Sequence, residues 1–119
     1  MKTPLDELPA LVIEAALEKK AFNILVLDLR NRSDITDYFI ICSGNSKAQV
    51  QAIVNSILEK TYETSFRPAG IEGLSTGNWV ILDIEDVFVH VFQKEVRSYY
   101  DLERLWGDVP VTEIEAAAN

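Results

Sequence analysis

The alternation of hydrophobic and polar positions is strongest late in the chain, over residues 78–92. Because the side chains of a β-strand point to opposite faces in turn, two alternating runs joined by a short acidic segment predict a β-hairpin. A tight turn centred on Ile84 and Glu85 would bring residues of the two strands together in cross-strand pairs. The expected pairs are Asp83 with Asp86, Ile81 with Phe88, and Trp79 with His90.

The two faces of this hairpin differ in kind. The aliphatic face comprises Val80, Leu82, Val87, Val89 and Val91. The opposite face, which we call the aromatic face, comprises Trp79, Ile81, Asp83, Asp86, Phe88, His90 and Phe92. The first composition predicts packing against helices. Aromatic rings that end in carboxylates are more typical of a surface that meets a partner, so we expect the aromatic face to be partly open.

Helical periodicity occurs in three other segments. The first is residues 5–21, where the regular helix is expected to start near Pro9, because proline is accommodated in a first turn. Ser46 followed by Gln49 is a capping-box pattern that predicts the start of a second helix. The third helix is predicted over residues 94–106, and Gly107 ends it.

Short hydrophobic runs over residues 24–29 and 37–43 predict two buried strands, and the glycine-rich residues 67–77 leave room for one more. The order of these elements predicts an α/β fold, with a mixed β-sheet and helices largely on one face. We assign residues 1–107 to a single domain. The acidic, then alanine-rich residues 108–119 are predicted to be a flexible tail.

Charge and composition narrow the function. The chain has 119 residues and a formal net charge of -8, which disfavours binding to bare nucleic acid and favours a basic protein partner. One cysteine and one histidine cannot form a Cys/His zinc site or an intrachain disulfide. Without a hydrophobic signal segment or a run long enough to span a membrane, the expected location is the cytoplasm.

Several separated motifs are similar to those of the ribosomal silencing factor family, also called Iojap. They occur in the family's order and cover about residues 5–107. The motifs are residues 37–44 with Ser46 and Gln49-Val50; Glu72-Gly73 with residues 78–83; Asp86-Val87 with residues 89–92 and Arg97; and residues 100–103 with Leu105-Trp106. The chain departs from the family at Glu85, where glycine is common, and at Asn45, where threonine is frequent.

The resemblance implies a non-enzymatic protein that binds the large ribosomal subunit through ribosomal protein L-fourteen. Bound on the face that meets the small subunit, it would block subunit association and lower translation when nutrients are scarce. The resemblance also implies a nucleotidyltransferase-like fold without the catalytic residues, and a homodimer when free. We expect no cofactor, no metal and no membrane association.

On this interpretation, the aromatic face supplies the apolar centre of the contact and nearby acids supply negative charge. The candidate partner-binding residues are Glu72, Trp79, Asp83, Phe88, His90, Phe92, Tyr99, Asp101, Glu103 and Trp106. From the residues alone, the large aromatic side chains can equally be core residues. A lone histidine on an apolar face is more often structural than catalytic.

Two other functions stay open. Asp83, Glu85 and Asp86 could hold magnesium and the Gly44-Asn45-Ser46 turn could hold phosphates, as in a nucleotidyltransferase. That signal is weak because the turn has one glycine and no strongly basic neighbourhood is present for a triphosphate. Alternatively, the open face could serve only self-association.

Overall fold

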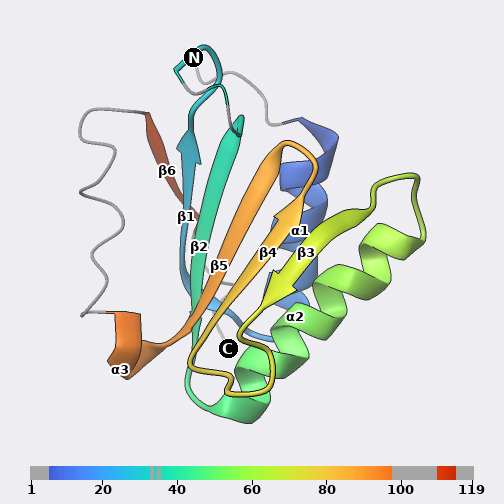
Figure 1. Cartoon of the computed structure of the whole chain (residues 1–119). Coiled ribbons are helices and arrows are strands. Elements are labelled where there is room, and N and C mark those ends of the chain that lie inside the picture. Colours follow the sequence, from blue (N-terminus) through green and yellow to red (C-terminus); the bar gives the residue numbers. More distant parts are fainter. Residues whose placement is uncertain (1–5, 33, 35, 98–109, 115–119) are drawn as a thin grey trace.

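A six-stranded sheet with strand order β3-β4-β5-β2-β1-β6 organises the chain (Figure 1). The computed structural model describes residues 6–32, 34, 36–97 and 110–114. The helices are α1 (Glu7–Glu18), α2 (Lys47–Tyr62) and α3 (Lys94–Arg97). The strands are β1 (Phe22–Asp28), β2 (Tyr38–Gly44), β3 (Pro68–Glu72), β4 (Trp79–Ile84), β5 (Val87–Gln93) and β6 (Val111–Ile114).

The sheet is mixed because β2 and β5 run parallel, whereas the other neighbouring strands pair antiparallel. A parallel pair needs a long crossover, and α2 with β3 and β4 supplies it. Every residue of β2 is buried, which explains why its sequence is a nearly continuous hydrophobic run. The predicted α/β class and mixed sheet are confirmed.

Helices α1 and α2 cover one face of the sheet (Figure 1). The aliphatic face of the hairpin packs there, in a core with α1 residues such as Val12 and α2 residues such as Ile53 and Ile57. A second, smaller core lies on the other face of the sheet and includes Val96 of α3. The helices therefore lie largely on one face, as predicted, and the short α3 is the exception.

Gln49 connects the start of α2 to the end of α1. The hydroxyl of Ser46 accepts the Gln49 N–H at 3.1 Å, which confirms the predicted N-cap. The Gln49 side chain accepts the Asn45 N–H at 2.6 Å and donates to the carbonyls of Lys19 and Lys20, each at 3.1 Å. One side chain thus satisfies backbone groups that no helix can pair internally.

The predicted hairpin register is wrong by two residues. Ile84 pairs with Val87, so the turn consists of Glu85 and Asp86. The Asp86 carbonyl accepts the N–H groups of Asp37 and Tyr38, at 2.9 and 3.1 Å, and the Thr36 hydroxyl at 2.7 Å. These hydrogen bonds join the turn to the start of β2, about 50 residues earlier in the chain. They require Asp86 to lie in the turn. Glu85 takes the left-handed conformation, with φ of 48°, which glycine adopts at lower cost.

The prediction of a flexible tail is wrong for Val111–Ile114, which form β6. This strand pairs antiparallel with β1, and the Pro110 carbonyl accepts the Asp28 N–H at 2.9 Å. Without β6, β1 would be an edge strand with a row of unpaired backbone groups. The tail sequence contains only a short alternating segment, so this pairing depends on a neighbour more than 80 residues away.

Over the part of the chain that the structure describes, no helix has the length and hydrophobicity needed to cross a membrane.

Substitution of Gln49 tests the connection between the helices. Gln49→Ala removes three hydrogen bonds, so we expect the free energy of unfolding to fall by about 1–2 kcal/mol. The matched control is Gln51→Ala, which removes a single bond to the Leu74 carbonyl and should cost about 0.5–1 kcal/mol. Urea unfolding measures both values. Equal losses for the two variants would contradict this role of Gln49.

Candidate functional site: the aromatic face

The strand register brings the aromatic side chains together on the face of the sheet away from α1 and α2. Trp79 lies opposite Phe92, Ile81 opposite His90, and Asp83 opposite Phe88. A slip of two residues preserves faces, so the predicted membership of the aromatic face holds for the strand residues, while Asp86 lies in the turn. On β2, Phe39 pairs with Phe88 and Ile41 with His90, which extends the face by one strand.

The rings on this face stack on one another. Trp79 and Phe92 lie 5.1 Å apart between centroids, with 21° between their planes. The His90 ring lies 4.3 Å from Phe39, and Phe39 meets Phe88 edge-on at 6.5 Å. Offset and edge-on contacts of this kind are favourable for aromatic rings. The rings therefore support each other as a single layer.

His90 is held neutral in this layer. The indole N–H of Trp79 donates to His90 Nδ1 at 2.9 Å. An indole nitrogen can only donate, so Nδ1 is unprotonated and the ring proton of neutral His90 is on Nε2. Burial lowers the pKa of His90 to about 4, because the charged form loses its hydration. At neutral pH the histidine contributes no positive charge to the face.

The expectation of an open aromatic face is wrong for two of its residues. His90 is 6% exposed and Phe92 is fully buried. Phe92 belongs to the second core, in which it packs with Leu27, Leu29, Phe39 and Ile41, and the His90 ring lies against Phe39 of that core. Trp79 and Phe88 are half-buried at the margin of this core, so each keeps some surface for a partner.

A small pocket of about 180 Å³ opens beside this margin. It is lined by Gly70, Glu72, Ile81, Asp83 and Phe88. The pairing of β3 with β4 produces it, since Gly70 lies opposite Asp83 and Glu72 opposite Ile81. The structure thus brings together three predicted partner-binding residues, Glu72, Asp83 and Phe88, which are separated by up to 16 positions in the sequence.

Four predicted residues lie outside the part of the chain that the structure describes. They are Tyr99, Asp101, Glu103 and Trp106. The predicted helix over residues 94–106 is described only as α3, at Lys94–Arg97.

The carboxylates of the alternative metal site do not converge on one position. Asp83 lies on the aromatic face beside Phe88. Glu85 instead accepts the Arg67 N–H at 3.0 Å. Among the described residues, no group of three histidine, cysteine, aspartate or glutamate side chains is placed to hold a metal ion.

Sequence reasoning missed the contribution of β2 and that of Gly70 in β3. Phe39 and Ile41 form part of the aromatic layer, and Gly70 lines the pocket. Phe39 and Ile41 are spaced by two, which indicates a shared face of a strand. Nothing in the local sequence indicates that this strand lies beside β5.

These features define a class: a one-sheet α/β protein whose exposed sheet margin carries aromatic and acidic residues. Two crystal structures share its fold. A Bacillus halodurans protein superposes with a TM-score of 0.80 and 40% identity, over 91% of this chain and 98% of that one. A Chromobacterium violaceum protein gives a TM-score of 0.83 and 36% identity, over 97% of each chain.

Sequence comparison identifies the family. The family model described as "Ribosomal silencing factor during starvation" matches residues 3–119, so the chain belongs to the ribosomal silencing factor family. The Bacillus subtilis protein named ribosomal silencing factor RsfS is 45% identical over 102 residues, 86% of each chain. Its Halalkalibacterium halodurans namesake is 43% identical over 114 residues, 96% of this chain and 97% of the relative. A chloroplastic Iojap protein of Zea mays is 35% identical, over 85% of this chain and 44% of the relative.

The low pKa of His90 predicts a specific pH dependence of stability. Between pH 6.5 and about 4 the unfolded histidine binds a proton that the folded one does not. The free energy of unfolding therefore decreases as the pH falls through this window, by roughly 3 kcal/mol over the full range. His90→Gln keeps an acceptor for Trp79 but does not titrate, so the variant should lack this component.

Urea unfolding of both proteins at pH 7 and pH 4.5 measures the effect. Carboxylate protonation is common to the two proteins and cancels in the difference between them. If the two stabilities fall in parallel, His90 is not the group responsible.

Proposed function

We propose that this protein represses translation without catalysing a reaction. It binds the large ribosomal subunit in the cytoplasm, through ribosomal protein L-fourteen, and sterically blocks association with the small subunit. Membership of the ribosomal silencing factor family supports the ribosomal target. The acidic and aromatic margin of the sheet supports binding to a basic protein.

The observation that carries this proposal is the pocket between β3, β4 and β5. Glu72, Asp83 and Phe88 line it together. An apolar contact rimmed by charged groups is the usual anatomy of a protein interface. Since His90 is neutral at physiological pH, no cation of the aromatic layer offsets these carboxylates. A partner with an exposed apolar residue and nearby lysine or arginine side chains complements this pattern.

The buried members of the aromatic face have an indirect role in this proposal. Trp79 stacks on Phe92 and donates to His90, and Phe39 contacts both His90 and Phe88. These contacts fix the position of Phe88 and of the strands that carry the carboxylates. A rigid surface loses less conformational entropy on binding.

Self-association remains part of the proposal for the free protein. Ile71 of the edge strand β3 is 41% exposed, one of three exposed large hydrophobic side chains among the residues that the structure describes. An edge strand with an exposed hydrophobic residue readily pairs with a second copy. Because Ile71 lies next to Glu72, such a homodimer and the ribosome complex would share a margin of the sheet.

Charge changes at the pocket test the main proposal. Glu72→Lys combined with Asp83→Asn removes the two carboxylates that line the pocket with Phe88 and adds one positive charge. We expect retention on purified large subunits to weaken by about ten-fold or more, because like charges then face each other across the contact. Co-sedimentation with large subunits measures retention, and light scattering measures subunit association.

The matched control combines Glu59→Lys on α2 with Asp34→Asn, both exposed and away from the pocket. It has the same net charge as the pocket variant but leaves the pocket residues unchanged, so it should bind large subunits as the unaltered protein does. Equal weakening in both double variants would reduce the effect to bulk charge and contradict the assigned surface. Magnesium-dependent nucleotide binding in calorimetry would instead support the nucleotidyltransferase interpretation.

A further inference from the structure

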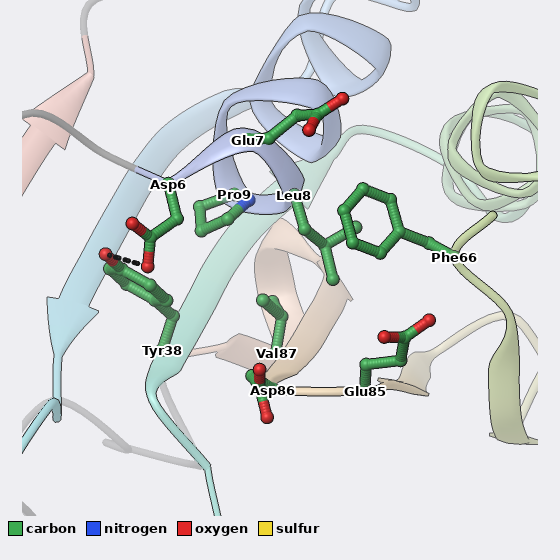
Figure 2. Close-up of a pocket in the computed structure, with 9 residues that line it drawn as sticks. All are labelled: Asp6, Glu7, Leu8, Pro9, Tyr38, Phe66, Glu85, Asp86 and Val87. Carbon is green, nitrogen blue, oxygen red and sulfur yellow. Dashed lines mark hydrogen bonds between the residues drawn. The ribbon is translucent and has the colours of Figure 1, made fainter. Parts of the chain in front are cut away.

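A second pocket opens on the helix-covered side of the sheet, at the turn end of the hairpin (Figure 2). Its volume is about 280 Å³. Four segments build it: the start of α1, the start of β2, the connection from α2 to β3, and the β4–β5 turn with the first residue of β5. Its lining residues are Asp6, Glu7, Leu8, Pro9, Tyr38, Phe66, Glu85, Asp86 and Val87.

The interior of this pocket is apolar. Leu8, Pro9 and Val87 are buried residues whose side chains face the cavity, and Phe66 is half-buried at its side (Figure 2). Leu8 and Val87 belong to the main core, which Phe66 joins at its margin. The walls are therefore fixed by core packing, as in a preformed binding pocket.

The rim of the pocket is acidic. Asp6, Glu7, Glu85 and Asp86 are all exposed, and no lysine or arginine is among the lining residues. In Figure 2, Asp6 and Glu85 lie on opposite sides of the pocket, and the Glu7 side chain points away from it. Of the ion pairs among the described residues, only the 3.9 Å contact between Asp6 and Arg30 involves this rim.

The two flanking carboxylates keep acceptor capacity for a ligand. Asp6 is the N-cap residue of α1, yet its side chain makes no cap hydrogen bond; instead Oδ2 accepts the Tyr38 hydroxyl at 3.1 Å. Glu85 uses Oε2 to accept the Arg67 N–H. A carboxylate has two oxygens and about four acceptor positions, so both residues can accept further donors.

We propose that this pocket binds an arginine side chain presented by an exposed basic segment of a protein partner. The aliphatic stem would contact Leu8, Pro9 and Phe66, and the guanidinium would lie between the carboxylates. Arginine suits this geometry better than lysine because its planar group donates in several directions at once. Arg30, which does not line the pocket, already lies over the ring of the lining residue Tyr38, at 5.1 Å from its centroid.

The surroundings favour a polypeptide over a small free cation. A groove between α1 and α2 shares Glu7 with the pocket and continues past Leu11, Glu14 and Glu63. A segment whose arginine enters the pocket can therefore extend along an acidic groove. Its one basic lining residue, Lys60, is already paired with Glu14 and Glu18. This inference does not depend on the proposed ribosome contact, since the two pockets lie on opposite faces of the sheet.

A short peptide tests the inference. The probe is a blocked pentapeptide with a central arginine between two leucines and a glycine at each end. Its control replaces the arginine with citrulline, which has the same shape and no charge. In amide NMR titrations of the full chain, the arginine peptide should shift Phe66 and residues 85–87, and the citrulline peptide should not.

Two charge-matched double variants locate the site. Glu85→Gln with Asp86→Asn removes two rim charges and should weaken peptide binding about five-fold, as expected for two exposed ion pairs. Glu72→Gln with Asp83→Asn removes two charges on the other face and should change the affinity less than two-fold. The same spectra show whether each variant is folded.

Three outcomes would overturn the inference. Shifts spread over the whole acidic surface, or equal weakening in both double variants, would indicate bulk charge attraction. Equal binding of the citrulline peptide would exclude guanidinium recognition. Binding of free arginine amide as tightly as the peptide would assign the pocket to a small cation. None of these outcomes depends on whether the Glu72 and Asp83 variants still bind large subunits.

Discussion

The structure depends on the complete burial of β2, which lies inside the sheet between β5 and β1. A strand buried on both faces requires a core on each side of the sheet. Helices α1 and α2 provide the cover on one side. On the other side, much of the cover comes from side chains of the sheet itself, where Phe39 and Ile41 pack with Leu27, Leu29 and Phe92. The centre of the aromatic face is consequently buried as a core, and only its margin is accessible to a partner.

Features that depend on local sequence patterns were predictable, and features that depend on distant contacts were not. Period-two alternation identified both faces of the hairpin, and the Ser46–Gln49 pattern identified the start of α2. The register was wrong because a slip of two residues leaves both faces unchanged, so hydrophobic patterning cannot detect it. What selects the actual register is a distant contact, in which the Asp86 carbonyl accepts three donors from the start of β2. The pairing of β6 with β1 likewise joins residues that are far apart in the sequence.

The candidate site was predictable in composition but not in shape. Glu72, Asp83 and Phe88 were selected because acids and aromatic residues suit a basic partner, and the β3–β4 pairing places them around one pocket. His90 and Phe92 were selected by the same reasoning and are buried. The difference lies in what covers them: Phe39 comes from a strand that is adjacent only through the parallel β2–β5 pairing. Burial of a strand face depends on the whole sheet and its partners, whereas periodicity identifies only which residues share that face.

The neutral state of His90 connects the core to the electrostatics of the surface. Its Nδ1 accepts the Trp79 indole N–H, and its burial removes the hydration that a charged ring needs. A protonated His90 would place a positive charge on the same face of the sheet as Asp83, since His90 lies two residues from Phe88, which pairs with Asp83. Because the pKa is about 4, that charge is absent at neutral pH. Glu72 and Asp83 therefore supply the charge at this pocket, and the neighbouring aromatic layer, in which His90 is neutral, adds none.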